Sequence, residues 1–205
     1  MQAMRRMRFS AALLSVLAWI AVSLQLGMSL QLVRTQGGGI AEALVIVLGY
    51  FTILSNLFVA LTAGAVALAP GSQLASSMLR GCATTAIVVV GLGYHLLLRQ
   101  IWDPQGWQWV ADNLLHYAVP VAALAHWLWF PPETRLPKRA PLLWALYPLA
   151  YLAYALVRGE WIGAYPYPFI DVPALGYAGV FAKAAGLLLV FVAVGALLGL
   201  AARRR

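Results

Sequence analysis

The segment "LGYFTILSNLFVAL" (residues 48–61) has the apolar composition of a membrane-spanning helix, yet four polar residues interrupt it: Tyr50, Thr52, Ser55 and Asn56. Residues three and four apart lie one above the other on a helix, so positions 52, 55 and 56 share one face. Polar side chains at membrane depth are costly and usually face the bundle interior or a wet cavity. We therefore expect this face to point inward, either to form hydrogen bonds between helices or to be part of a functional site.

The whole chain has the composition of a polytopic membrane protein. Of its 205 residues, 63% are hydrophobic and 10% are charged, whereas a soluble domain carries about 25% charged residues. A spanning helix needs about 20 mostly apolar residues. The sequence therefore predicts an all-α protein with one six-helix transmembrane domain over residues 1–205. The predicted spans are residues 9–32, 43–68, 78–98, 113–130, 141–157 and 175–202.

The distribution of charge predicts that both termini are cytoplasmic, because ten basic residues fall on the side of the termini and three on the other side. The ten are Arg5, Arg6, Arg8, Arg80, Arg135, Lys138, Arg139, Arg203, Arg204 and Arg205; the three are Arg34, Arg99 and Arg158, with Lys183 buried in the sixth segment. The formal net charge of +8 does not indicate nucleic-acid binding, because these residues flank the spans. We expect membrane lipids as partners and a bacterial cytoplasmic membrane as the location.

Polar residues from four separate segments converge on the outer half of the predicted membrane. Besides the face with Thr52, these are His95 in the third span, Asp112, Asn113 and His116 at the fourth, and Tyr167 and Asp171 in the last outer loop. A threonine hydroxyl is a poor nucleophile until a base takes its proton, and histidine is the usual base. Thr52 and His116 are the candidates for these two roles.

Each of these residues also has a structural interpretation. A threonine or serine in a membrane helix commonly bonds its own i−4 carbonyl, an asparagine commonly links two helices, and His95 stands where an interfacial histidine would stand. The single cysteine, Cys82, excludes an intrachain disulfide. The histidines lack the spacing of metal ligands, so we expect no metal and no cofactor.

Three stretches, in this order along six predicted helices, resemble the Pr6Pr family of bacterial membrane proteins: "YFTILSNLFVAL" (50–61), "DNLLHYAVPVAALAHWLWF" (112–130) and "YPYPFIDV" (165–172). The layout is more distantly similar to the androgen-induced integral membrane proteins, which are threonine hydrolases of fatty acid esters of hydroxy fatty acids. That similarity implies a catalytic threonine in the second helix and a catalytic histidine upstream of a proline in the fourth. On this chain they are Thr52 in "YFTILSN" and His116 in "HYAVP".

The leading hypothesis is a lipid-ester hydrolase in which Thr52 attacks the ester carbonyl and His116 takes and returns the proton. We expect an outward-opening pocket between the second, third and fourth helices, capped by the last outer loop, with an apolar part for an acyl chain. Two alternatives stay open. One is a non-enzymatic protein that binds or moves a small amphiphile through the same pocket, and the other is a structural membrane subunit whose polar faces only join helices.

Other polar residues receive supporting roles according to the side of the membrane and the depth at which they are expected to lie. Asp112 or Asp171 would orient the histidine, and Asn56 or His95 would help to hold a developing oxyanion. At 1.5 Å of rise per residue, position 52 lies about 13 Å below the start of its predicted span, whereas position 116 lies about 5 Å below the start of its own. We therefore expect the nucleophile and the base to meet only if a helix is tilted.

Overall fold

The computed structural model describes residues 2–132 and 136–202, and its regular elements over these residues are all helical. The prediction of an all-α protein is confirmed. Five helical segments are long and apolar enough to cross a membrane: Gln2–Thr35, Phe51–Leu68, Ser77–Leu98, Ala140–Ile162 and Val172–Ala201. Such helices fit a membrane protein. Of the charges used above to orient the chain, Arg135, Arg203, Arg204 and Arg205 lie outside the described residues.

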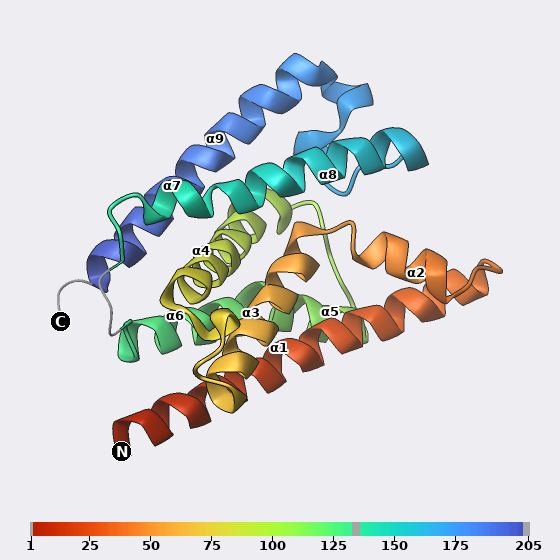
Figure 1. Ribbon diagram of the computed structural model, residues 1–205. Helices are drawn as coiled ribbons and strands as arrows, with labels where there is room; N and C mark the ends of the chain where they lie inside the picture. Colours follow the sequence, from red (N-terminus) through yellow and green to blue (C-terminus); the bar gives the residue numbers. More distant parts are fainter. Residues whose placement is uncertain (1, 133–135, 203–205) are drawn as a thin grey trace.

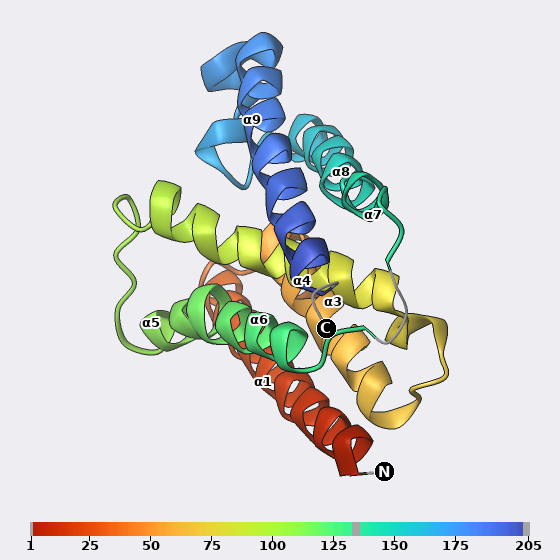
Figure 2. The same ribbon diagram turned by 90° about the vertical axis from the view of Figure 1, so that its left-hand side faces the viewer.

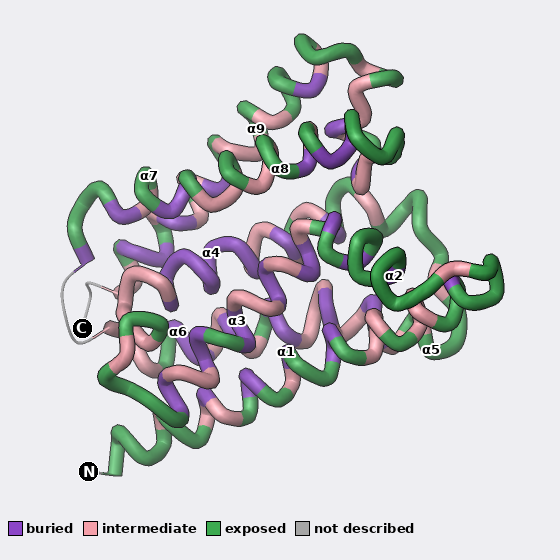
Figure 3. Tube along the Cα trace, turned by 45° about the vertical axis from the view of Figure 1, so that its right-hand side comes forward, coloured by how far each residue is buried: buried purple, intermediate pink, exposed green. Residues whose placement is uncertain are grey.

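Helices α3 (Phe51–Leu68) and α4 (Ser77–Gly93) form the centre of the molecule (Figure 1). On one side α1 (Gln2–Thr35) packs along α3, and on the other α9 (Val172–Ala201) packs along α4. In the most apolar 18-residue stretch of α3, 56% is buried inside the protein. The corresponding share is 33% for α1 and 22% for α9. Figure 3 shows this contrast as buried central helices between exposed outer ones.

The outer helices expose large apolar side chains. Phe9 and Leu13 on α1 are 67% and 57% exposed, and Leu189 on α9 is 72% exposed. Soluble monomers rarely expose contiguous apolar surface of this kind, so these faces suit lipid. Lys183 is also exposed rather than buried as predicted, because it lies on the face of α9 that is turned away from the bundle.

Two layers of helices lie on opposite sides of α4 (Figure 2). Helix α6 (Val119–Trp129) joins α1, α3 and α4 in one hydrophobic cluster built around small residues such as Ala18, Ala60 and Ala83, which let helices approach closely. On the other side, α7 (Ala140–Trp144) and α9 pack on α4 around two large side chains, Trp144 and Phe191. Further elements include α8 (Leu146–Ile162) and the short η1 (Gln73–Ala75) and η4 (Pro168–Ile170).

The predicted continuous helix over residues 43–68 is wrong, because the chain breaks at residues 48–50. Helix α2 (Ile40–Val47) ends before the break, and α3 begins at Phe51. Gly49 stands in the break where a Cβ would lie 2.6 Å from Arg158 Cζ, so only glycine fits without a shift of that guanidinium. The approach of α8 therefore requires glycine at this point of the chain.

Side chains of α8 hold the break by bonding its free carbonyls. The hydroxyls of Tyr151 and Tyr154 donate to the carbonyl oxygens of residues 49 and 48, at 3.0 and 3.3 Å. Arg158 Nε and Nη2 donate to the carbonyl of Val45, at 3.3 and 2.9 Å. Backbone groups that water cannot reach must be bonded within the protein. These three side chains therefore stabilise an interruption that hydrophobic periodicity does not reveal.

The fourth predicted span, 113–130, begins earlier and changes its helix type. It consists of α5 (Gly106–Asn113), the π-helical turn η3 (Leu114–Ala118) and α6. Pro120 has no N–H for the carbonyl of residue 116 and its ring crowds that carbonyl, which accounts for the wider turn just upstream. A second π-helical turn, η2 (Tyr94–Leu98), ends α4. The two wide turns lie on neighbouring helices, at the place where the site forms.

We expect Arg158→Met to lower the free energy of unfolding by about 2 kcal/mol, because it leaves the carbonyls of Val45 and Ala164 without their charged donor while keeping most of the side-chain volume. Thermal unfolding in detergent, followed by tryptophan fluorescence, measures the change as a fall in Tm. Arg34→Met, at an exposed arginine, is the matched control. Equal Tm values for the two variants would show that Arg158 does not hold the break.

Candidate functional site

Thr52 and His116 meet in the structure, with 3.4 Å between Thr52 Oγ1 and His116 Nε2. Thr52 is the second residue of α3, directly after the break, and His116 is the central residue of η3. Thr52 therefore stands at the start of a new helix and not some way down a continuous one. The break, which the sequence did not predict, removes the difference in depth that would otherwise have required a tilted helix.

Asp112 sets which nitrogen of His116 faces the threonine. His116 Nδ1 lies 3.0 Å from the backbone oxygen of Asp112 and 3.2 Å from its Oδ1. A backbone carbonyl can only accept, so Nδ1 carries the hydrogen in the neutral imidazole and Nε2 presents a lone pair. The ring of Tyr94 stacks on the imidazole with centroids 4.0 Å apart and 15° between planes, which fixes the plane of the ring.

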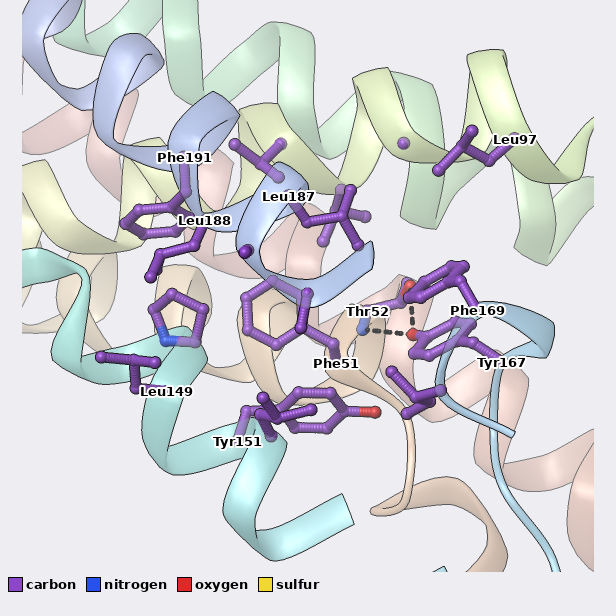
Figure 4. Close-up of a pocket in the computed structure, with 18 of the residues that line it drawn as sticks. Phe51, Thr52, Leu97, Leu149, Tyr151, Tyr167, Phe169, Leu187, Leu188 and Phe191 are labelled. Atoms are coloured by element: carbon purple, nitrogen blue, oxygen red, sulfur yellow. Dashed lines mark hydrogen bonds between the residues drawn. The ribbon is translucent and has the colours of Figure 1, made fainter. Parts of the chain in front are cut away.

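Tyr167 reaches Thr52 from the last loop (Figure 4). Its hydroxyl accepts a hydrogen bond from Thr52 N–H at 3.2 Å and lies 3.3 Å from Thr52 Oγ1. Burial raises the pKa of Tyr167 to about 12, so the phenol stays protonated at neutral pH. The hydrogen bonds can then form a chain. Thr52 N–H donates to the Tyr167 hydroxyl, Tyr167 O–H can donate to Thr52 Oγ1, and Thr52 O–H can donate to His116 Nε2.

This group of side chains lies between two cavities. The polar cavity, of about 600 Å³, is lined by α1, the break, η2, α5, η3 and the last loop; its polar side chains include Gln25, Ser29, Gln108, Asp112 and His116. The apolar cavity, of about 290 Å³, is lined mainly by aliphatic and aromatic residues of α4, α8 and α9. Thr52, Tyr94, Leu98 and Tyr167 line both cavities. A molecule with one polar and one apolar part could therefore lie across the threonine.

Two of the candidate residues on α3 make structural contacts. Asn56 Nδ2 donates to the carbonyl of Thr52 at 2.8 Å and to that of Leu115 at 3.3 Å, which ties α3 to η3. Ser55 Oγ lies 3.4 Å from the hydroxyl of Tyr147. Neither Asn56 nor Ser55 is among the residues that line the two cavities. Asn56 therefore positions the helix of Thr52 against the turn of His116 and does not line either cavity.

The remaining candidates lie away from the pair. His95 Nδ1 bonds the hydroxyl of Tyr117 at 3.1 Å, and Asn113 Nδ2 donates to the carbonyl of Trp109 at 2.8 Å. Asp171 accepts a hydrogen bond from the backbone N–H at the start of α9, at 3.3 Å. Of the two acidic residues considered as partners of the histidine, it is therefore Asp112 that lies beside it.

Sequence reasoning missed three side chains at the site. Gln25 and Gln108 line the polar cavity, so α1 contributes to a pocket that we predicted from the second, third and fourth helices. An amide within an apolar segment, as at position 25, was the available signal. No feature of the sequence marked Tyr94 as a site residue, because an aromatic residue near the end of a span is typical of packing.

Comparison with known proteins finds no matching family model, curated protein or solved structure. Within residues 2–132 and 136–202, no group of three or more His, Cys, Asp and Glu side chains could hold a metal ion. The function is therefore argued from the geometry of the site.

The contact between Thr52 and His116 can be tested without a substrate. In a Cys82→Ala background, we expect Thr52→Cys to react with iodoacetamide at pH 7 about tenfold faster than the same variant with His116→Gln, because a neighbouring imidazole stabilises the thiolate. The alkylation rate is measured by mass spectrometry. His95→Gln, which changes a histidine outside both cavities, is the control and should leave the rate unchanged. A rate that is insensitive to His116→Gln would contradict the pairing.

Proposed function

We propose that the protein is an intramembrane lipid-ester hydrolase with Thr52 as nucleophile and His116 as base. The observation that carries this proposal is the 3.4 Å contact of Thr52 Oγ1 with Nε2 of a histidine whose Nδ1 lies 3.0 Å from the backbone oxygen of Asp112. A nucleophile within reach of a base that a third group orients is the usual arrangement for acyl transfer. The more distant similarity of "YFTILSN" and "HYAVP" to the androgen-induced membrane proteins supports the same pair.

The first half of the reaction transfers the acyl group to the enzyme. His116 Nε2 takes the hydroxyl proton as Thr52 Oγ1 bonds to the ester carbonyl carbon, and the carbonyl oxygen becomes an oxyanion. The hydroxyl of Tyr167, already 3.3 Å from Oγ1, is placed to donate to that oxyanion. The bond from carbon to the alcohol oxygen then breaks. His116 gives its proton to the leaving oxygen, which yields a free alcohol and acyl-Thr52.

The second half restores the enzyme. A water molecule takes the place of the alcohol, and His116 Nε2 accepts one of its protons as the water oxygen bonds to the acyl carbon. The bond to Thr52 Oγ1 then breaks, Oγ1 recovers the proton from His116, and a fatty acid leaves. Throughout both halves, Asp112 holds Nδ1 and stabilises the imidazolium that forms at each proton transfer.

In this proposal the protein crosses the membrane six times, and α5, η3 and α6 together make the fourth span, in addition to the five apolar helices named above. They form a helical path of 24 residues, about 36 Å at the usual rise, which exceeds the hydrocarbon thickness of about 30 Å. Their polar side chains lower the hydropathy of this path relative to the other spans. Both termini would be cytoplasmic by the positive-inside bias, in a bacterial cytoplasmic membrane, with the site in the outer half.

We expect a fluorophosphonate probe to label the wild-type protein at Thr52, and Thr52→Ala and His116→Ala to abolish the labelling. Gel fluorescence measures the extent, and mass spectrometry identifies the modified residue. Thr62→Ala is the matched control, because Thr62 is buried on the same helix and bonds its own i−4 carbonyl at 2.8 Å. A well-folded wild-type protein that stays unlabelled would favour the amphiphile-binding alternative, and a co-purifying lipid would then identify the ligand.

Tyr167→Phe removes the hydroxyl that we assign to the oxyanion. We expect kcat for ester hydrolysis to fall about 100-fold or more, as is typical when one oxyanion donor is lost, and KM to change little. Tyr165→Phe is the control, because the hydroxyl of Tyr165 bonds the exposed Glu160 at 3.0 Å. If both variants kept wild-type kcat, Tyr167 would be a packing residue.

A further inference from the structure

The two cavities differ in whether they reach the base. His116 lines the polar cavity and is not among the residues that line the apolar cavity. In acyl transfer, the base must return its proton to the oxygen of the leaving alcohol. The alcohol part of an ester must therefore leave on the side of the polar cavity, and the acyl chain is left to the other side.

The apolar cavity suits an alkyl chain. Figure 4 shows Leu187, Leu188 and Phe191 of α9 extending along the cavity away from Thr52. Apart from Thr52, the polar side chains in its described lining are those of tyrosines. The hydroxyl of one of them, Tyr151, already donates to a carbonyl of the break. An alkyl chain here would gain about 25 cal/mol for each Å² of apolar surface removed from water, and it would displace no hydrogen bond.

No fixed positive charge lines the polar cavity in the part of the chain that the structure describes. Among the described residues that line it there is no lysine or arginine, and Asp112 is an acid. Arg158 lies close by, but its Nε and Nη2 donate to the carbonyl of Val45 and its Nη1 to that of Ala164. Arg99 is exposed and does not line the cavity. An anionic group bound here would lose water without gaining a cationic partner and would face a carboxylate, which is costly.

Neutral polar groups line the same cavity instead. Gln108 Nε2 donates to Gln25 Oε1 at 3.0 Å, and Gln25 Nε2 donates to Ser29 Oγ at 3.3 Å. Amide and hydroxyl groups of this kind can both donate to and accept from an alcohol. These three side chains are half-buried, and each keeps donor or acceptor capacity that the hydroxyl groups of a ligand could use.

We propose that the substrate is an acyl ester of a neutral alcohol that carries further hydroxyl groups, with the acyl chain in the apolar cavity and the alcohol beside Gln25 and Gln108. This inference rests on the proposed hydrolase activity. It extends that activity by assigning each half of the ester to a cavity. It also disfavours esters whose alcohol part bears a carboxylate or a phosphate, among them the fatty acid esters of hydroxy fatty acids on which the androgen-induced proteins act.

The test compares three esters of one long acyl chain, presented in detergent to the purified protein. They are a monoacylglycerol, a monoacylglycerol phosphate, and an ester of a hydroxy acid with a free carboxylate. We expect kcat/KM for the monoacylglycerol to exceed that for either anionic ester by about tenfold or more, because an unpaired buried charge is disfavoured by at least that factor. Gln108→Lys should shift the ratio at least tenfold toward the anionic esters, and Gln100→Lys, an exposed glutamine outside the cavity, should leave it unchanged.

The outcomes separate the two proposals. Hydrolysis of an anionic ester as fast as the monoacylglycerol would overturn the selection for a neutral alcohol and leave the hydrolase intact. A ratio that moves equally in both lysine variants would place the alcohol elsewhere and overturn the assignment of the polar cavity. Hydrolysis of none of the three esters by a folded protein would overturn the hydrolase, and this inference with it.

Discussion

The interruption of the second helix at residues 48–50 is the feature on which the rest of the site depends. It is held by Tyr151, Tyr154 and Arg158 of α8, which supply donors for the carbonyls that a continuous helix would have bonded internally. Because of the break, α3 starts one residue before Thr52. The hydroxyl and the backbone N–H of Thr52 therefore lie where the two cavities share their lining. A helix without the interruption would carry its threonine past the histidine.

The same interruption joins parts of the chain that are far apart in sequence. Helix α8 bonds the carbonyls of the break, and the loop that follows α8 carries Tyr167 back to Thr52. On the other side, the π-helical turn caused by Pro120 carries His116, and Asn56 ties that turn to α3. Thr52, His116 and Tyr167, to which we assign the roles of nucleophile, base and oxyanion donor, thus come from three segments, and each is fixed by contacts that also hold the fold together.

The helical class and the positions of the apolar segments follow from composition and hydropathy, and so does the choice of Thr52 and His116 as polar residues that face inward. The break at Gly49 does not, because the side chains that hold it come from α8, and one of them, Arg158, lies 109 positions further along the chain. For the same reason the sequence left two acids as partners of the histidine, and only the fold brings Asp112 beside it. The polar cavity needed Gln25 from a helix that the sequence places far from the motif residues.

The most direct test of this account is a structure of the protein after reaction with a long-chain alkyl fluorophosphonate. We predict phosphorus bonded to Thr52 Oγ1, a phosphoryl oxygen toward the hydroxyl of Tyr167, and the alkyl chain beside Leu188 and Phe191 in the apolar cavity. Such a result would place nucleophile, donor and acyl chain together. Phosphorus bonded to another residue, or an alkyl chain that lies beside Gln25 and Gln108, would contradict it.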